Sequence, residues 1–134
     1  MLDIIFIQHQ KSGIRLLEYR QEHTKFQEEH SDIFSGFMSA IQNITRELNI
    51  GVLVLISTEG AKGHNCIIVH EPPINVIILV DQNDPVDLWR KQGSEIAERF
   101  IEKYGVDFNP HHLNIFYDFI SVIKEMCADH EYCT

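Results

Sequence analysis

Apolar residues near the start of the chain form two short runs separated by a polar turn. The runs Leu2–Gln8 and Ile14–Tyr19 have the composition of strands, and Gly13 closes the turn that begins at Gln10. Glycine tolerates the positive φ that tight hairpin turns need. The pattern therefore predicts that the chain opens with a β-hairpin.

After a polar connection at residues 20–30, apolar side chains recur every three or four positions. Ser31 or Asp32 is suited to cap the helix that this spacing predicts. Its apolar face is formed by Phe34, Phe37, Ile41, Ile44 and Leu48, and it is widened by Ile33, Met38 and Ala40. Gly36, Ser39 and Ala40 are small, which would let another element approach this helix closely.

Three further strands are predicted in the middle of the chain, at Gly51–Ser57, Cys66–His70 and Ile74–Val80. The first and the third are apolar at nearly every position. Antiparallel strands usually alternate, with one face in water, so a strand that is apolar on both faces needs a cover on each side of the sheet.

Two helices are predicted after the strands. Asp84 suits the N-cap of the first and Pro85 its first position, while Gly105 suits its C-terminal end. Its expected buried stripe is Val86, Trp89, Ile96, Phe100 and Tyr104, with Gly93 as a weak point. Asn109-Pro110 introduces the second helix, whose apolar positions are Leu113, Phe116, Ile120 and Ile123, ending near Met126. We expect the polar tail at 129–134 to fray.

The order ββ-α-βββ-α-α predicts a single α+β domain over residues 1–134. Short strands joined by hairpins make the five-stranded sheet mainly antiparallel. The first helix would cover one face and the last two helices the other, giving a three-layer α-β-α sandwich.

This topology and apolar pattern resemble the longin domain from Met1 to roughly Met126. The related roadblock family begins with a helix, whereas this chain begins with a strand. Profilin and the PAS or GAF sensor domains also have a central antiparallel sheet and stay open as alternatives. A sensor of PAS or GAF type would need an internal cavity for a small molecule.

The longin resemblance implies a non-catalytic scaffold or regulator that dimerises or docks partners. The implied partners are a second copy, another longin or roadblock protein, or a small GTPase, as in vesicle-trafficking complexes. The expected seam lies on the first helix and the edge strand after it, because an apolar edge strand is a hazard unless it is paired. Its residues are Gly36, Ser39, Ala40, Asn43, Val52, Val54 and Ile56.

Composition narrows the class of partner. The chain has 20 acidic and 11 basic residues and a net charge of −9, which argues against nucleic acid or an anionic membrane as the main partner. The longest apolar run, Val52–Ile56, is too short to cross a bilayer, and no signal-peptide pattern opens the chain. Cys66, Cys127 and Cys133 are an odd number without framework spacing, so we expect reduced thiols and a cytoplasmic protein.

The remaining candidate motifs do not have the residue spacing of known catalytic or cofactor-binding motifs, so we expect no catalytic residue and no cofactor. The loop Gly60–His64 holds two glycines and a lysine but lacks the phosphate-loop pattern. The cluster formed by Cys127, His130 and Cys133, with His111 and His112 nearby, is either a metal site or a solvated tail, and we favour the tail. His64, Cys66 and His70 would share one face of a strand, as a rim with one buried cysteine.

Overall fold

The strands form one open antiparallel sheet in the order β2-β1-β5-β4-β3. This arrangement comes from a computed structural model that describes residues 1–129, 132 and 133. The strands are β1 (Leu2–His9), β2 (Arg15–Arg20), β3 (Leu55–Ser57), β4 (His64–Glu71) and β5 (Ile74–Asp81). The predicted antiparallel sheet of five strands is therefore confirmed.

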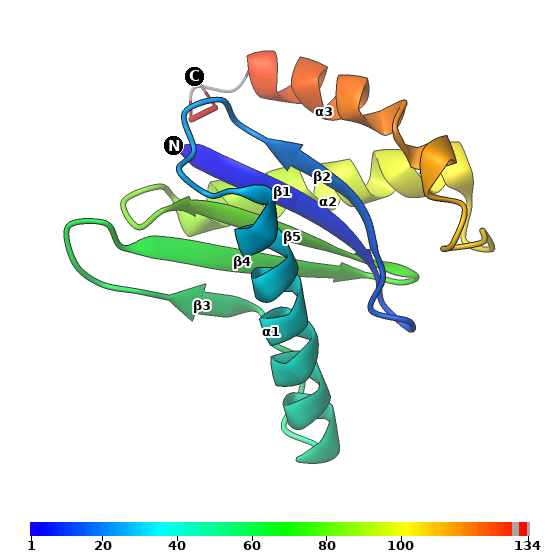
Figure 1. The fold of residues 1–134 in the computed structure, drawn as a ribbon, viewed down its shortest axis with the longest axis horizontal. Coiled ribbons are helices and arrows are strands. Elements are labelled where there is room, and N and C mark those ends of the chain that lie inside the picture. Colours follow the sequence, from blue (N-terminus) through cyan, green and yellow to red (C-terminus); the bar gives the residue numbers. More distant parts are fainter. Residues whose placement is uncertain (130–131, 134) are drawn as a thin grey trace.

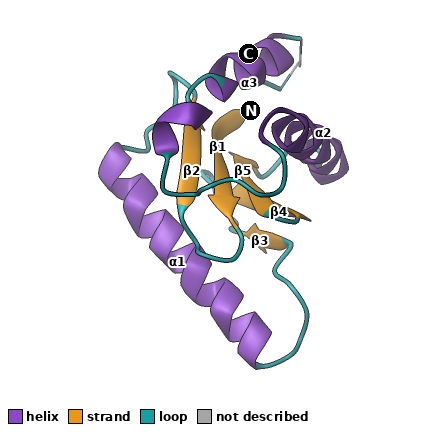
Figure 2. Ribbon diagram, turned by 90° about the vertical axis from the view of Figure 1, so that its right-hand side faces the viewer, coloured by secondary structure: helices purple, strands orange, loops and turns teal. Residues whose placement is uncertain are grey.

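Helices cover both faces of this sheet, as Figures 1 and 2 show. Helix α1 (Glu28–Glu47) crosses one face. Helix α2 (Val86–Tyr104), the 3₁₀ helix η1 (Leu113–Phe116) and α3 (Phe119–Ala128) cover the other. The predicted order and layers are confirmed, except that the single helix expected up to Met126 is divided into η1 and α3.

The larger core lies between the sheet and α2, η1 and α3. Trp89, Phe100, Phe116 and Phe119 are fully buried there among the aliphatic side chains of the strands. Gly93 lets α2 approach the sheet, because a Cβ at this position would lie 2.8 Å from Cγ2 of Val69. Gly93, which the sequence alone suggests would weaken the helix, is thus the residue at which the helix packs most closely on Val69.

The smaller core, between the sheet and α1, stops just before one end of the central strands. Its buried members are Ile4, Phe6, Met38, Cys66, Ile68, Ile77 and Leu79. The next residues on the same sheet face are Gln8, Asn75 and His70, and the strand register places Gln8 opposite Asn75 and His70 opposite Asn75. A polar row therefore crosses the three central strands where the apolar core ends.

Polar residues near the helix starts hold tertiary contacts rather than caps. Helix α1 begins at Glu28, ahead of the predicted Ser31 or Asp32. Ser31 is buried and donates to Oε1 of Glu18 over 2.6 Å, and Asp32 pairs with Arg15 at 2.9 Å. The start of the helix is instead closed by a capping box, in which the Gln27 backbone N–H donates to Nδ1 of His30 at 3.1 Å.

The start of α2 differs from its prediction in a similar way. The helix begins at Val86 and Pro85 is its N-cap, so Asp84 is not the capping residue. Asp84 instead accepts from the Trp89 indole N–H at 3.0 Å and from the Met1 ammonium at 2.6 Å. The carboxylate thus joins the N-terminus of the chain to the first turn of the helix.

The C-terminal cysteines correct two expectations. Cys127 and Cys133 form a disulfide, so reduced thiols are wrong for this pair, and only Cys66 is a free thiol. In the expected frayed tail, the Tyr132 carbonyl accepts from the Leu2 backbone N–H and the Cys133 carbonyl accepts from Nε2 of Gln21. Residues 132 and 133 are therefore held against the sheet.

Candidate protein-interaction surface

Helix α1 is longer than the apolar surface that it covers. Figures 1 and 2 show its C-terminal part extending past the edge of the sheet at β3. The polar row Gln8–Asn75–His70 explains this, because beyond Phe34 and Met38 the sheet offers no apolar surface for the helix to bury. The predicted covering face of α1 is thus only partly buried.

The rest of that face is exposed to solvent. Ile33 is 70% exposed, and Phe37, Ile44 and Leu48 are about half exposed or more. These residues recur every four or seven positions, so they form one stripe along the helix. In the segment that follows the helix, Ile50, Val52, Val54 and Leu55 are also exposed. We call these eight residues the α1–β3 surface.

The edge strand β3 is shorter than predicted. The sequence predicts a strand from Gly51 to Ser57 that is buried on both faces, but the strand comprises only Leu55–Ser57. The carbonyl of Val54 accepts from the Ile68 backbone N–H at 3.0 Å and from the Arg90 guanidinium at 2.9 Å. Arg90 therefore holds the segment before β3 against β4, while the side chains of Val52 and Val54 remain exposed.

The predicted seam residues fall into two groups. Gly36, Ala40 and Asn43 on α1 are exposed, as are Val52 and Val54. Ser39 and Ile56 are half-buried and already have partners inside the domain. Ser39 accepts from Nε2 of Gln8 at 3.1 Å, and Ile56 packs against the smaller core. The seam itself stays a prediction, and five of its seven residues face solvent.

Sequence reasoning omitted six of the eight members of the α1–β3 surface. These are Ile33, Phe37, Ile44, Leu48, Ile50 and Leu55. It assigned all of them except Ile50 to the core, because they continue a helical stripe or an apolar run. The signal that could have found them is the break in strand alternation at Gln8, His70 and Asn75. Those three positions mark where the sheet stops being apolar.

The other candidate motifs remain separate in space. Nε2 of His64 lies 2.9 Å from the Asp3 carboxylate, and its Nδ1 lies 2.7 Å from the Lys62 carbonyl. Cys66 is buried, and burial raises the pKa of its thiol to about 12. Across the part of the chain that is described, no three histidine, cysteine or acidic side chains gather to hold a metal ion. His130, of the proposed cysteine cluster, lies outside the described residues.

Within the described residues, no helix is both long and apolar enough to span a bilayer. Helix α1 exposes Ile33, Phe37 and Ile44, while Phe34 and Met38 pack against the smaller core. An exposed apolar stripe of this kind is a candidate interaction surface.

Comparison with known proteins identifies the fold. No protein-family model matches the chain, and no curated protein is significantly similar to it in sequence. Among solved structures, the chain is similar to MglB of Myxococcus xanthus, with a TM-score of 0.52 and 14% sequence identity. The match covers 76% of this chain and 85% of that one. The chain therefore has a longin-like α+β fold.

Proposed function

We propose that this chain is a non-catalytic interaction module that pairs through its α1–β3 surface. The observation that carries the proposal is the exposure of eight large apolar side chains on α1 and on the segment from Ile50 to Leu55. A patch of this kind is costly in water and marks interaction surfaces in proteins. Pairing would remove it from solvent.

The occupant that we propose is a second copy of the chain or another longin or roadblock protein. In a symmetric dimer the same surface is buried on both subunits, so a self-complementary apolar stripe is sufficient. The outer edge of β3 lies beside the stripe, and antiparallel pairing of two such edges would satisfy their backbone groups. The pair would then present a shared surface to a small GTPase, as the longin resemblance implies.

The first test is the oligomeric state measured by light scattering at tens of micromolar. We expect a dimer, and we expect Val54→Lys to give a monomer because a charge would be buried in the seam. Ile115→Lys is the matched control, since Ile115 is 48% exposed, close to the 47% of Val54, but lies in η1. A wild-type monomer, or equal effects of the two variants, would contradict self-pairing.

The second test addresses the GTPase partner. Purified small GTPases from the same source, loaded with GDP or GTP, would be titrated against the wild type and Val54→Lys. We expect binding by the dimer and weaker binding by the monomeric variant. Absence of binding to every GTPase in both states would remove this part of the proposal and leave the pairing intact.

A sensor function of PAS or GAF type is the second candidate, because one specific observation favours it. A cavity of about 700 Å³ opens at the end of the sheet. It lies beside the smaller core, in contact with solvent, whereas the sensor hypothesis expects a cavity enclosed between sheet and helix. The cavity is therefore an argument for ligand binding, but not for a PAS or GAF type of domain.

A further inference from the structure

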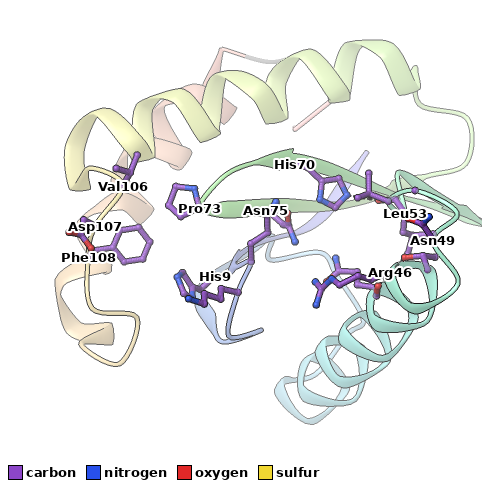
Figure 3. Close-up of a pocket in the computed structure, with 16 residues that line it drawn as sticks. His9, Arg46, Asn49, Leu53, His70, Pro73, Asn75, Val106, Asp107 and Phe108 are labelled. Atoms are coloured by element: carbon purple, nitrogen blue, oxygen red, sulfur yellow. Dashed lines mark hydrogen bonds between the residues drawn. The ribbon is translucent and has the colours of Figure 1, made fainter.

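The cavity lies between the C-terminal half of α1 and the hairpin ends of the sheet. Figure 3 shows Val106 and Phe108, from the loop after α2, at one end and Arg46 of α1 at the other. Asn75 and His70 of the polar row lie between them. A volume of about 700 Å³ is within the usual range for small-molecule sites.

The floor of the cavity is a connected set of amide side chains. Gln10 donates to Oδ1 of Asn75 at 2.9 Å, and Asn75 donates to Oε1 of Gln8 at 3.4 Å. Gln8 in turn donates to the Ser39 hydroxyl. Because the two innermost amides are buried and bonded to each other, the floor is fixed before any ligand arrives.

The charged groups of the cavity are mainly cationic, although the chain as a whole is acidic. Lys11 and Arg46 line it together with one carboxylate, Asp107. The full chain has 20 acidic and 11 basic residues, so this local excess of positive charge runs against the composition. Within the described part of the chain, neither Lys11 nor Arg46 forms an ion pair.

One neutral donor in the cavity also lacks a partner. Nε2 of Gln42, on α1, is buried and has no hydrogen-bond acceptor among the described residues. A buried donor without an acceptor destabilises the folded protein. Gln42 lines the same cavity as Arg46, one helical turn away. An acceptor-rich ligand would satisfy the amide and the guanidinium together.

His9 adds a polar ring to the cavity. Burial lowers the pKa of His9, and the nearby Lys11 and His111 lower it further. Nδ1 of His9 lies 2.7 Å from the Ser12 hydroxyl and 3.3 Å from the Ser12 backbone nitrogen. Phe108 packs edge-on against this ring at 5.7 Å and forms an apolar wall.

We propose that the cavity binds a small organic anion, with its carboxylate or phosphate held near Arg46, Lys11 and Gln42 and its apolar body against Phe108 and Val106. Two cationic side chains and one carboxylate line the cavity, which favours a ligand rich in oxygen acceptors. The apolar wall selects a ligand with a ring or chain rather than an inorganic ion. The site goes beyond the pairing proposed above and does not depend on it.

The test uses 1-naphthyl phosphate and 1-naphthoate as probes, with 1-naphthol and inorganic phosphate as the two halves. Binding is followed by calorimetry and by backbone amide NMR shifts. We expect each anionic probe to bind at least about tenfold more tightly than either half. The shifts should centre on Asn75, His70 and Gln42. Absence of saturable binding by both anionic probes at millimolar concentration would overturn the proposal.

Two variants separate this site from adventitious binding. Arg46→Gln should weaken binding about tenfold, whereas Arg99→Gln, which removes an exposed guanidinium on α2, should leave it unchanged. Gln42→Leu should weaken binding while the melting temperature stays equal or rises, because an unsatisfied donor is removed. Equal binding by Arg46→Gln and the wild type would overturn the site. Shifts confined to Ile44 and Leu55 would overturn it as well and would assign the probe to the α1–β3 surface.

Discussion

Gly93 of α2 lies so close to Val69 of β4 that a Cβ at Gly93 would be 2.8 Å from Cγ2 of Val69. The same Cβ would lie 3.0 Å from Cδ1 of Ile78. Val69 and Ile78 are both buried, and the β-branched Val69 cannot move its methyl without changing rotamer. This contact sets the distance between the helix and the sheet.

Gly93→Ala should therefore destabilise the fold, although alanine is the better helix former. Alanine gains about 1 kcal/mol in helix propensity, whereas overpacking a core costs about 1–3 kcal/mol. We expect a net loss of about 1 kcal/mol in the free energy of unfolding, measured by urea denaturation.

Gly36 is the control, because it lies in α1 and a Cβ added there would have no heavy atom within 4 Å. Gly36→Ala should raise the free energy of unfolding by about 0.5–1 kcal/mol. If Gly93→Ala were as stabilising as Gly36→Ala, the close approach of α2 to β4 would be wrong.

Asp84→Ala should cost about 2 kcal/mol of stability, because hydrogen bonds to a charged group are worth about 1.5–3 kcal/mol. Asp84 is buried and accepts from the indole of Trp89, the only tryptophan. Urea unfolding followed by tryptophan fluorescence measures the loss. Asp87→Ala, at an exposed position in the first turn of α2, should cost less than about 1 kcal/mol. Equal losses would show that only helix-end charge matters.

The spacing of apolar residues correctly predicted those strands and helices whose apolar faces are buried. The run Ile74–Val80 became the central strand β5, and the stripe from Trp89 to Phe100 became the buried face of α2. Gly105 ends α2 with a φ of 75°, as a C-terminal glycine should. In the fold, each apolar face of these elements packs against another apolar surface.

Tertiary partners decided the rest. Phe37 and Ile44 fit a helical stripe, but whether a stripe is buried depends on the surface opposite, which ends at Gln8 and Asn75. Ser31 is a good capping residue, yet Glu18 and Arg20 of β2 bind its hydroxyl inside the helix. The cavity was missed for the same reason. Lys11, Arg46 and Phe108 are far apart in sequence and meet only in the fold.

The thiol of Cys66 should be unreactive in the folded protein. Burial raises its pKa to about 12, against about 8.5 for a free cysteine, so at pH 8 the thiolate fraction falls by roughly a thousandfold. Iodoacetamide labelling at pH 8, followed by mass spectrometry, should be slow in buffer and fast in urea. Labelling at similar rates in both solvents would contradict the burial of Cys66 in the smaller core.

The same pKa fixes the sign of a pH effect on stability. Above about pH 9 the unfolded chain loses the Cys66 proton while the folded chain keeps it up to about pH 12. The contribution to stability is therefore complete below pH 9 and is lost as the pH rises toward 12. Cys66→Ala should flatten this decline relative to the wild type, as measured by urea midpoints between pH 8 and 11.

Reduction of the Cys127–Cys133 disulfide should release the C-terminal segment and lower stability. The cysteines are 6 residues apart, and closing so short a loop is worth about 2 kcal/mol in the chain-entropy model. The Leu2 N–H donates to Tyr132 and Nε2 of Gln21 donates to Cys133, so both bonds depend on the position of the segment. Dithiothreitol should lower the urea midpoint and speed hydrogen exchange at Leu2. The Cys66→Ala variant keeps the disulfide, so dithiothreitol should lower its urea midpoint by the same amount. The Cys133→Ser variant lacks the disulfide, so dithiothreitol should not change its urea midpoint. Three alkylated cysteines in protein denatured without reductant would contradict the disulfide and restore the reduced thiols that the sequence predicts.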